Sequence, residues 1–162
     1  MAASRMDEGM DVGARECDTW FANHDKNFRN YDQTLRRIET EVAAMERRVA
    51  QYGRTMKYGL NACMIIGETD HEAIDVADDY LAQLARDPSI FSASGGLGSN
   101  VIGTPKTIAE RIRRYQDLGI DLFMLQFYPF RQGLEVFAEK VLPLLDVKRT
   151  ARPPAPPAQA AE

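Results

Sequence analysis

The segment KYGLNACMII, residues 57–66, restricts the fold of this chain more than any other feature. Its apolar residues follow one another almost without interruption, and such a run is typical of a β-strand that is covered on both faces. Strands of this kind occur in parallel sheets, in which helices connect one strand to the next. We therefore expect strands and helices to alternate along the chain.

Two further segments predict strands, DTWFA at residues 18–22 and IDLFMLQF at residues 120–127. Both contain aromatic residues and are followed by turn residues. Between the strands, apolar residues recur at steps of three and four, which places them on one face of a helix. Helices are expected over residues 31–52, from Thr69 or Asp70 to the stop at Asp87-Pro88, from Pro105 to Leu118, and after Phe130.

This alternation predicts an α/β fold with about three parallel strands and flanking helices. An isolated sheet of three parallel strands would have two unpaired edges and exposed apolar faces, which native proteins usually avoid. A complete (β/α)8 barrel needs roughly 250 residues, and at least about 200, whereas the chain has 162. We expect that further strands are missing from this sequence or that another chain supplies them.

Residues 89–103, SIFSASGGLGSNVIG, are rich in glycine and serine and lack helical periodicity. They predict a long mobile loop, and loops of this length often have a function. The stretch lacks the lysine of a phosphate-binding P-loop and does not lie between a strand and a helix, which argues against a nucleotide site. A flexible lid that includes Ser94, Gly95 and Gly96 is the better interpretation.

The composition is typical of one globular domain, since 44% of the chain is hydrophobic and 27% is charged. We expect this domain to cover residues 1–147. The net charge of −4, without long runs of like charge, offers no footprint for nucleic acid. Two cysteines without a secretory signal indicate reduced thiols in a cytoplasmic protein, and no apolar stretch approaches the ~20 residues that span a membrane. Residues 148–162, rich in proline and alanine, are expected to form a disordered tail.

Four motifs in this order resemble the luciferase-like, flavin-dependent monooxygenases: RECDTWFAN at residues 15–23, KYGLNACMII at 57–66, NVIGTPKTIAERI at 100–112 and LGIDLFMLQFYP at 118–129. Within that family the chain resembles the branch of the alkanesulfonate and dimethyl sulfone monooxygenases. The resemblance implies the C-terminal part of a (β/α)8 TIM barrel, with the three predicted strands as its sixth to eighth strands. Residues 89–103 take the place of the loop that closes over reduced flavin in the family.

Active sites of such barrels lie where the strands give way to the loops that follow them. The resemblance therefore implies particular residues at these strand ends, together with a phosphate-binding turn near the start of the chain. They are, for catalysis, Tyr128 and Asn61; for the cofactor, Asn23, Trp20, Ser4 and Arg5; and for the substrate or the lid, Cys63, Gln126, Ser94, Gly95 and Gly96.

Each candidate also has an ordinary structural interpretation. For Asn61 a site-facing role is favoured, because burying an amide without partners costs ~1–3 kcal/mol. Cys63 is better explained as a small buried hydrophobe and Trp20 as a core residue, whereas Tyr128 fits either role. The two histidines have no ligand partner at a suitable spacing, so we expect no metal site.

The resemblance implies a monooxygenase that uses reduced FMN and O2 to oxidise a small organosulfur or related compound. A separate NAD(P)H:flavin reductase would supply the reduced flavin. In such enzymes the cofactor carries the oxygen chemistry, and the protein orients it and excludes water. The alternative is a non-catalytic remnant or interaction module, which pairs with a second copy as a homo-oligomer, or with another chain, to complete the fold.

Overall fold

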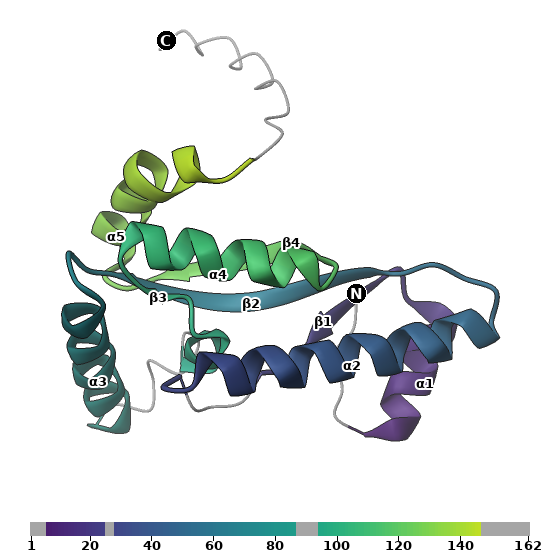
Figure 1. Cartoon of the computed structure of the whole chain (residues 1–162). Coiled ribbons are helices and arrows are strands. Elements are labelled where there is room, and N and C mark those ends of the chain that lie inside the picture. Colours follow the sequence, from purple (N-terminus) through teal and green to yellow (C-terminus); the bar gives the residue numbers. More distant parts are fainter. Residues whose placement is uncertain (1–5, 25–27, 87–93, 147–162) are drawn as a thin grey trace, which may run out of the picture.

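The structure is a computed structural model that describes residues 6–24, 28–86 and 94–146. Strands and helices alternate through most of this part of the chain (Figure 1). The predicted α/β fold with parallel strands is confirmed, and the three predicted strands are β1, β2 and β4. The elements are α1 (Asp7–Glu16), β1 (Thr19–Ala22), α2 (Tyr31–Gln51), β2 (Lys57–Ile66), α3 (Asp70–Arg86), η2 (Ser94–Ser99), β3 (Ile102–Gly103), α4 (Pro105–Asp117), β4 (Ile120–Phe127), α5 (Phe130–Val136), η3 (Phe137–Val141) and η4 (Leu142–Leu144). The tail expected at residues 148–162 lies outside the described residues.

β2 is the strand to which the other three described strands are hydrogen-bonded. β1 pairs with its first four residues, and β4 pairs with it from Tyr58 to Met64. The short strand β3, which the sequence did not predict, pairs with Ile65 and Ile66. All three pairings are parallel, as expected for strands that are joined by helices.

β1 and β3 lie on the same edge of β2, one at each end. In a parallel strand the N–H and C=O of one residue point to one edge, and those of the next residue point to the other. Lys57 N donates to the residue before β1 (3.0 Å) and Gly67 N donates to Gly103 O (3.1 Å), so odd-numbered residues face this edge. Tyr128 N donates to Met64 O (3.0 Å) on the opposite edge, where β4 lies.

The glycine-rich helix η2 packs against β2 between β1 and β3. A Cβ atom on Gly96 would lie only 2.5 Å from the backbone nitrogen of Cys63, and Leu97 is 1% exposed. The prediction of a mobile loop over residues 89–103 is therefore wrong from Ser94 onward, while the start of that segment lies outside the described residues. The glycines that suggested mobility instead permit one backbone to approach another closely.

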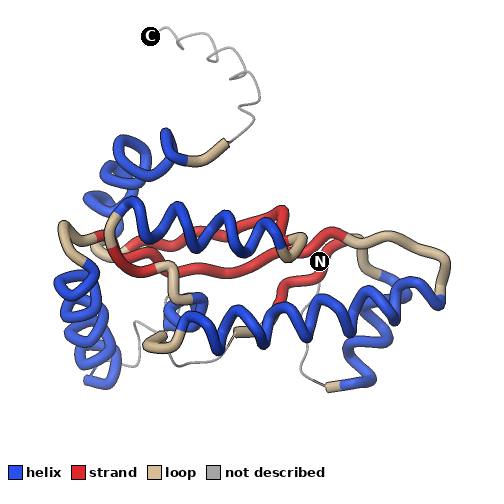
Figure 2. Tube along the Cα trace, in the orientation of Figure 1, coloured by secondary structure: helices blue, strands red, loops and turns tan. Residues whose placement is uncertain are grey.

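The helices α2 and α4 cover the same face of the sheet (Figure 2). Their N-terminal and C-terminal turns meet through an edge-to-face contact between Tyr31 and Tyr115, with ring centroids 5.6 Å apart. Even-numbered residues of β2 pack against these helices. Buried members of this core include Met10 and Ala14 of α1, Trp20 and Ala22 of β1, Ile38, Val42, Met45 and Val49 of α2, Leu60, Ala62 and Met64 of β2, Ile108, Ile112 and Tyr115 of α4, and Ile120 and Phe127 of β4.

The opposite face of the sheet, which we call the inner face, is covered only in part. By strand register and the alternation of side chains, it carries Phe21 of β1, Gly59, Asn61, Cys63 and Ile65 of β2, and Leu122, Met124 and Gln126 of β4. At the carboxyl end of β2, residues of α3 and η2 bury Cys63 and Ile65. Over β4 the face is open, because Leu122 and Met124 are 44% and 48% exposed.

Glu41 connects α2 to the end of β1. The Trp20 ring is completely buried and packs on Gly13 of α1, and its Nε1 donates to Glu41 Oε1 (3.0 Å). The backbone N–H of Asn23 donates to both carboxylate oxygens, at 3.1 Å each. Hydrogen bonds to a carboxylate are stronger than bonds between neutral groups, so one side chain fixes both the Trp20 ring and the chain that follows β1.

Glu41→Ala is expected to lower the free energy of unfolding by about 2–3 kcal/mol, because it leaves the buried Trp20 Nε1 without its acceptor. Glu46→Ala, at an exposed position of the same helix, is the matched control and should change it by less than about 0.5 kcal/mol. Urea denaturation followed by circular dichroism measures both. Equal effects of the two substitutions would contradict the role given to Glu41.

Gly96→Ala is expected to destabilise the fold by about 2 kcal/mol or more, because the new Cβ overlaps the backbone of β2, which cannot move away cheaply. Gly53→Asn is the control, since a side chain at Gly53 meets nothing within 4 Å and asparagine tolerates its positive φ. Thermal unfolding of both variants tests the prediction. If η2 were a mobile lid, Gly96→Ala would leave the melting temperature unchanged.

Candidate functional site

The candidate site residues that the sequence predicted lie in two separate groups in the structure. Asn61, Cys63 and Gln126 share the inner face, and Asn61 lies diagonally across the β2–β4 pairing from Gln126. Tyr128 directly follows β4 at the carboxyl end of the sheet. Asn23 follows β1, and its side chain turns toward α2. The structure therefore brings the inner-face residues together but separates them from the group around Asn23.

Asn61 lies in the middle of β2, directly opposite Met124 of β4. Its Oδ1 atom is buried, and within the described part of the chain it has no hydrogen-bond partner. An unsatisfied buried acceptor costs ~1–3 kcal/mol. A leucine of similar size would avoid that cost, so Asn61 is the residue whose chemistry the fold itself does not explain.

Cys63 is completely buried, beneath Gly96 and in the same cluster as Tyr80. Burial raises the pKa of Cys63 to about 12, so the thiol stays protonated at neutral pH and is not a nucleophile. Residues of α3 and η2 cover Cys63 on the inner face. Its alternative interpretation as a small buried hydrophobe agrees with this burial.

The ring of Tyr128 packs against α3 instead of against the sheet. Its ring stacks on Tyr80 with centroids 4.0 Å apart and an angle of 24° between the planes. Its hydroxyl donates to Gln83 Oε1 over 3.1 Å. Burial is the main cause that raises the pKa of Tyr80. In this arrangement Tyr128 lies at the carboxyl end of the sheet, and its hydroxyl is bound to a glutamine side chain of α3.

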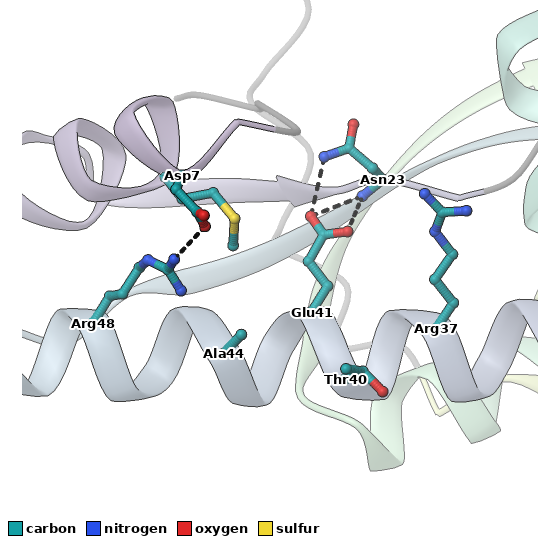
Figure 3. Close-up of a pocket in the computed structure, with 8 residues that line it drawn as sticks. Asp7, Asn23, Arg37, Thr40, Glu41, Ala44 and Arg48 are labelled. Carbon is teal, nitrogen blue, oxygen red and sulfur yellow. Dashed lines mark hydrogen bonds and ion pairs between the residues drawn. The ribbon is translucent and has the colours of Figure 1, made fainter.

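A cleft of about 440 Å³ opens beside Asn23 between α1 and α2 (Figure 3). Asn23 Nδ2 donates to Glu41 Oε1 (3.0 Å), and Arg48 binds the carboxylates of Asp7 (2.6 Å) and Asp11 (2.8 Å). The polar groups of this cleft thus bind mainly to one another. Its lining residues are Asp7, Met10, Asn23, Arg37, Thr40, Glu41, Ala44 and Arg48.

Trp20, which the resemblance assigns to the cofactor, is completely buried on the helix side of β1, and this burial agrees with its alternative interpretation as a core residue. Ser4 and Arg5 lie outside the described residues. Ser94 and Gly95 begin η2, and Gly96 packs on β2 as described above. Among the described residues, no three His, Cys, Asp or Glu side chains lie close enough to hold a metal ion, and no described helix is long and apolar enough to cross a membrane.

Two structurally important residues escaped the sequence analysis, Glu41 and Arg111. Arg111 Nη1 donates to Asn100 O (2.6 Å) and to Ile102 O (2.7 Å), and its guanidinium lies over the ring of Tyr31 at 4.8 Å. Burial lowers the pKa of Arg111. Both residues stand inside an apolar helical stripe, three positions after a buried isoleucine, and a charge at that spacing was the signal that could have identified them.

No family model matches the chain. Among solved structures it is similar to a riboflavin lyase that was determined with modified FMN and its substrate riboflavin, with a TM-score of 0.65 and 17% identity over 88% of this chain and 41% of that one. It is also similar to a long-chain alkane monooxygenase, with a TM-score of 0.55 and 22% identity over 87% of this chain and 39% of that one.

A third similar structure is the EDTA monooxygenase of Chelativorans sp. BNC1, with a TM-score of 0.58 and 18% identity over 88% of this chain and 42% of that one. The chain thus spans about two fifths of the length of each of these proteins. At these identities the likeness concerns the fold. The described residues adopt part of the (β/α) barrel fold of these proteins, in which parallel strands alternate with flanking helices.

Proposed function

We propose that this chain forms part of a cytoplasmic, flavin-dependent monooxygenase of the luciferase-like type, and that it corresponds to the C-terminal part of the barrel. The substrate is a small organosulfur or related compound, the co-substrate is O2, and a separate NAD(P)H:flavin reductase supplies reduced FMN. The support is the fold shared with two monooxygenases and with a riboflavin lyase solved with modified FMN, together with the four sequence motifs.

The inner face is the main support for the proposal, because the polarity of its surface fits the ring of a flavin. Leu122 and Met124 supply exposed apolar surface, and Phe21 lies on the same face beside Gly59. An uncharged, flat ring matches such a surface. Bound reduced flavin would supply the two electrons that activate O2. The phosphate would have to bind elsewhere, and Ser4 and Arg5 are the residues we propose for it.

The chain's own residues have distinct tasks in this proposal. Asn61 and Gln126 orient the bound substrate on the inner face, and the apolar side chains around them exclude water. Tyr128 holds a proton at its Oη at the carboxyl end of β4, where it can be donated once the bond to Gln83 breaks. Asn23 holds the end of β1 against α2 through its bonds to Glu41.

Flavin titration of the full chain tests the proposal. Quenching of flavin fluorescence should report binding of both riboflavin and FMN, with FMN bound roughly 10-fold more tightly because a charge-assisted bond to its phosphate contributes about 1.5 kcal/mol. Arg5→Ala should remove that difference and leave riboflavin unaffected. Arg15→Ala, which removes an exposed arginine paired with Glu16, is the control and should change neither affinity.

The outcomes separate the parts of the proposal. If the chain binds neither flavin, the proposed function fails. If it binds both flavins and Arg5→Ala changes neither affinity, the proposal that the inner face binds the flavin ring is retained, and Arg5 does not bind the phosphate.

A second candidate function is an interaction module that another chain, or a second copy of this one, completes. The observation that favours it is the edge of β4. Within the described chain β4 pairs only with β2, and Leu122 and Met124 beside that edge remain almost half exposed. On α5, Phe130 and Leu134 are 70% and 44% exposed. Apolar surface next to an unpaired strand promotes pairing with other chains.

This candidate predicts concentration-dependent association of the purified chain, measured by sedimentation equilibrium. Met124→Lys should shift the equilibrium toward monomer by about 10-fold, because an inward-pointing charge beside an edge strand opposes its pairing. Val12→Lys on α1, where Val12 is 51% exposed, is the control and should have no effect. A wild-type chain that stays monomeric at all concentrations counts against self-association.

A further inference from the structure

The inner face is uncharged around Asn61. The strand register places Gly59, Asn61 and Cys63 of β2 opposite Leu122, Met124 and Gln126 of β4. The charged residues of these two strands lie near their amino ends. Lys57 begins β2 and is exposed, and Asp121 stands at the irregularity where the pairing shifts register. Lys57 is four residues from Asn61, which is about 13 Å along an extended strand.

The Asn61 amide is a polar group of this face that packing does not explain. Its Oδ1 is buried and finds no partner among the described residues. The directly opposite residue, Met124, is 48% exposed and has an unbranched, flexible side chain that adapts to neighbouring groups. In the arrangement inferred below, a ligand displaces Met124 to reach the Asn61 oxygen. Gln126 lies diagonally beside Asn61 and adds a second amide to the same patch.

From this arrangement we infer that Asn61 determines specificity: the inner face takes an uncharged organosulfur compound whose O–H or N–H donates to Asn61 Oδ1, and it disfavours anionic compounds such as sulfonates. This substrate class rests on the proposed function. Two physical arguments support it. The acceptor regains the hydrogen bond that burial denies it. An anion on this face would lose its hydration without meeting a cation among the neighbouring described residues of β2 and β4.

Three matched thioethers test the inference, with binding to the full chain measured by saturation-transfer NMR. The first probe, 2-(methylthio)ethanol, has a hydroxyl donor. The second, methyl propyl sulfide, has the same size but no donor, and the third, 2-(methylthio)ethanesulfonate, carries a negative charge. The alcohol is expected to bind roughly 5-fold more tightly than the sulfide, as one neutral hydrogen bond would give, and the sulfonate more weakly than either.

Asn61→Leu should abolish the preference for the alcohol over the sulfide while leaving the sulfide bound. It should also raise the melting temperature, because it removes an unsatisfied buried acceptor. Gln51→Leu, the same amide-to-leucine change at an exposed position of α2, is the control and should keep the preference. A structural role for Asn61 would give the opposite result for stability, and no change in the preference between alcohol and sulfide.

Three results would overturn the inference: no binding of any thioether, binding of the sulfonate as tight as that of the alcohol, or an unchanged alcohol preference in Asn61→Leu. A riboflavin titration of the same variant distinguishes the substrate from the cofactor. Riboflavin affinity should be unchanged, and a loss would mean that Asn61 serves the flavin. Failure of the wild-type chain to bind flavin would count against the proposed function alone, because the thioether results do not depend on it.

Discussion

The sheet depends on β2, because the other described strands take their main-chain hydrogen bonds from it. Its even-numbered residues face α2 and α4, and its odd-numbered residues near the carboxyl end face α3 and η2. A strand packed on both sides needs apolar side chains at nearly every position. Gly59 and Asn61 depart from that requirement, and both lie on the inner face. The Phe21 ring fills the space that a side chain at Gly59 would take, so Asn61 is the position of β2 on this face that packing does not explain.

Two charged residues fix the chain where the strand pairing stops. Glu41 accepts the N–H of Asn23 after β1, and Arg111 donates to the carbonyl groups of Asn100 and Ile102 before and within β3. Main-chain groups at these ends lack a strand partner, and leaving them unpaired would be costly. The sign of each charge suits its task, because a carboxylate accepts hydrogen bonds and a guanidinium donates them. Each residue reaches these groups from within an apolar stripe, so it also stays anchored in the core.

The sequence predicted the strands and helices because their apolar residues recur at regular spacings, and it singled out Asn61 because an amide interrupts an apolar strand. It did not predict η2 and β3, since glycine and serine are equally compatible with mobility and with the close backbone contact that Gly96 makes. It also could not assign faces. A strand buried on both sides lacks the alternation that separates them, so the sequence left open on which side of the sheet Trp20 and Cys63 lie, and both are completely buried.

The two faces of the sheet impose different conditions on what can cover them. The helix side is closed by side chains of this chain, whereas the inner face over β4 is open among the described residues. Either a ligand or further strands would have to bury Leu122 and Met124, which favours apolar surface, and would have to offer a donor to Asn61. A charged occupant would lose hydration without gaining an ion pair from the neighbouring described residues of β2 and β4. The inner face therefore selects by the same rule whether it binds a small molecule or a polypeptide.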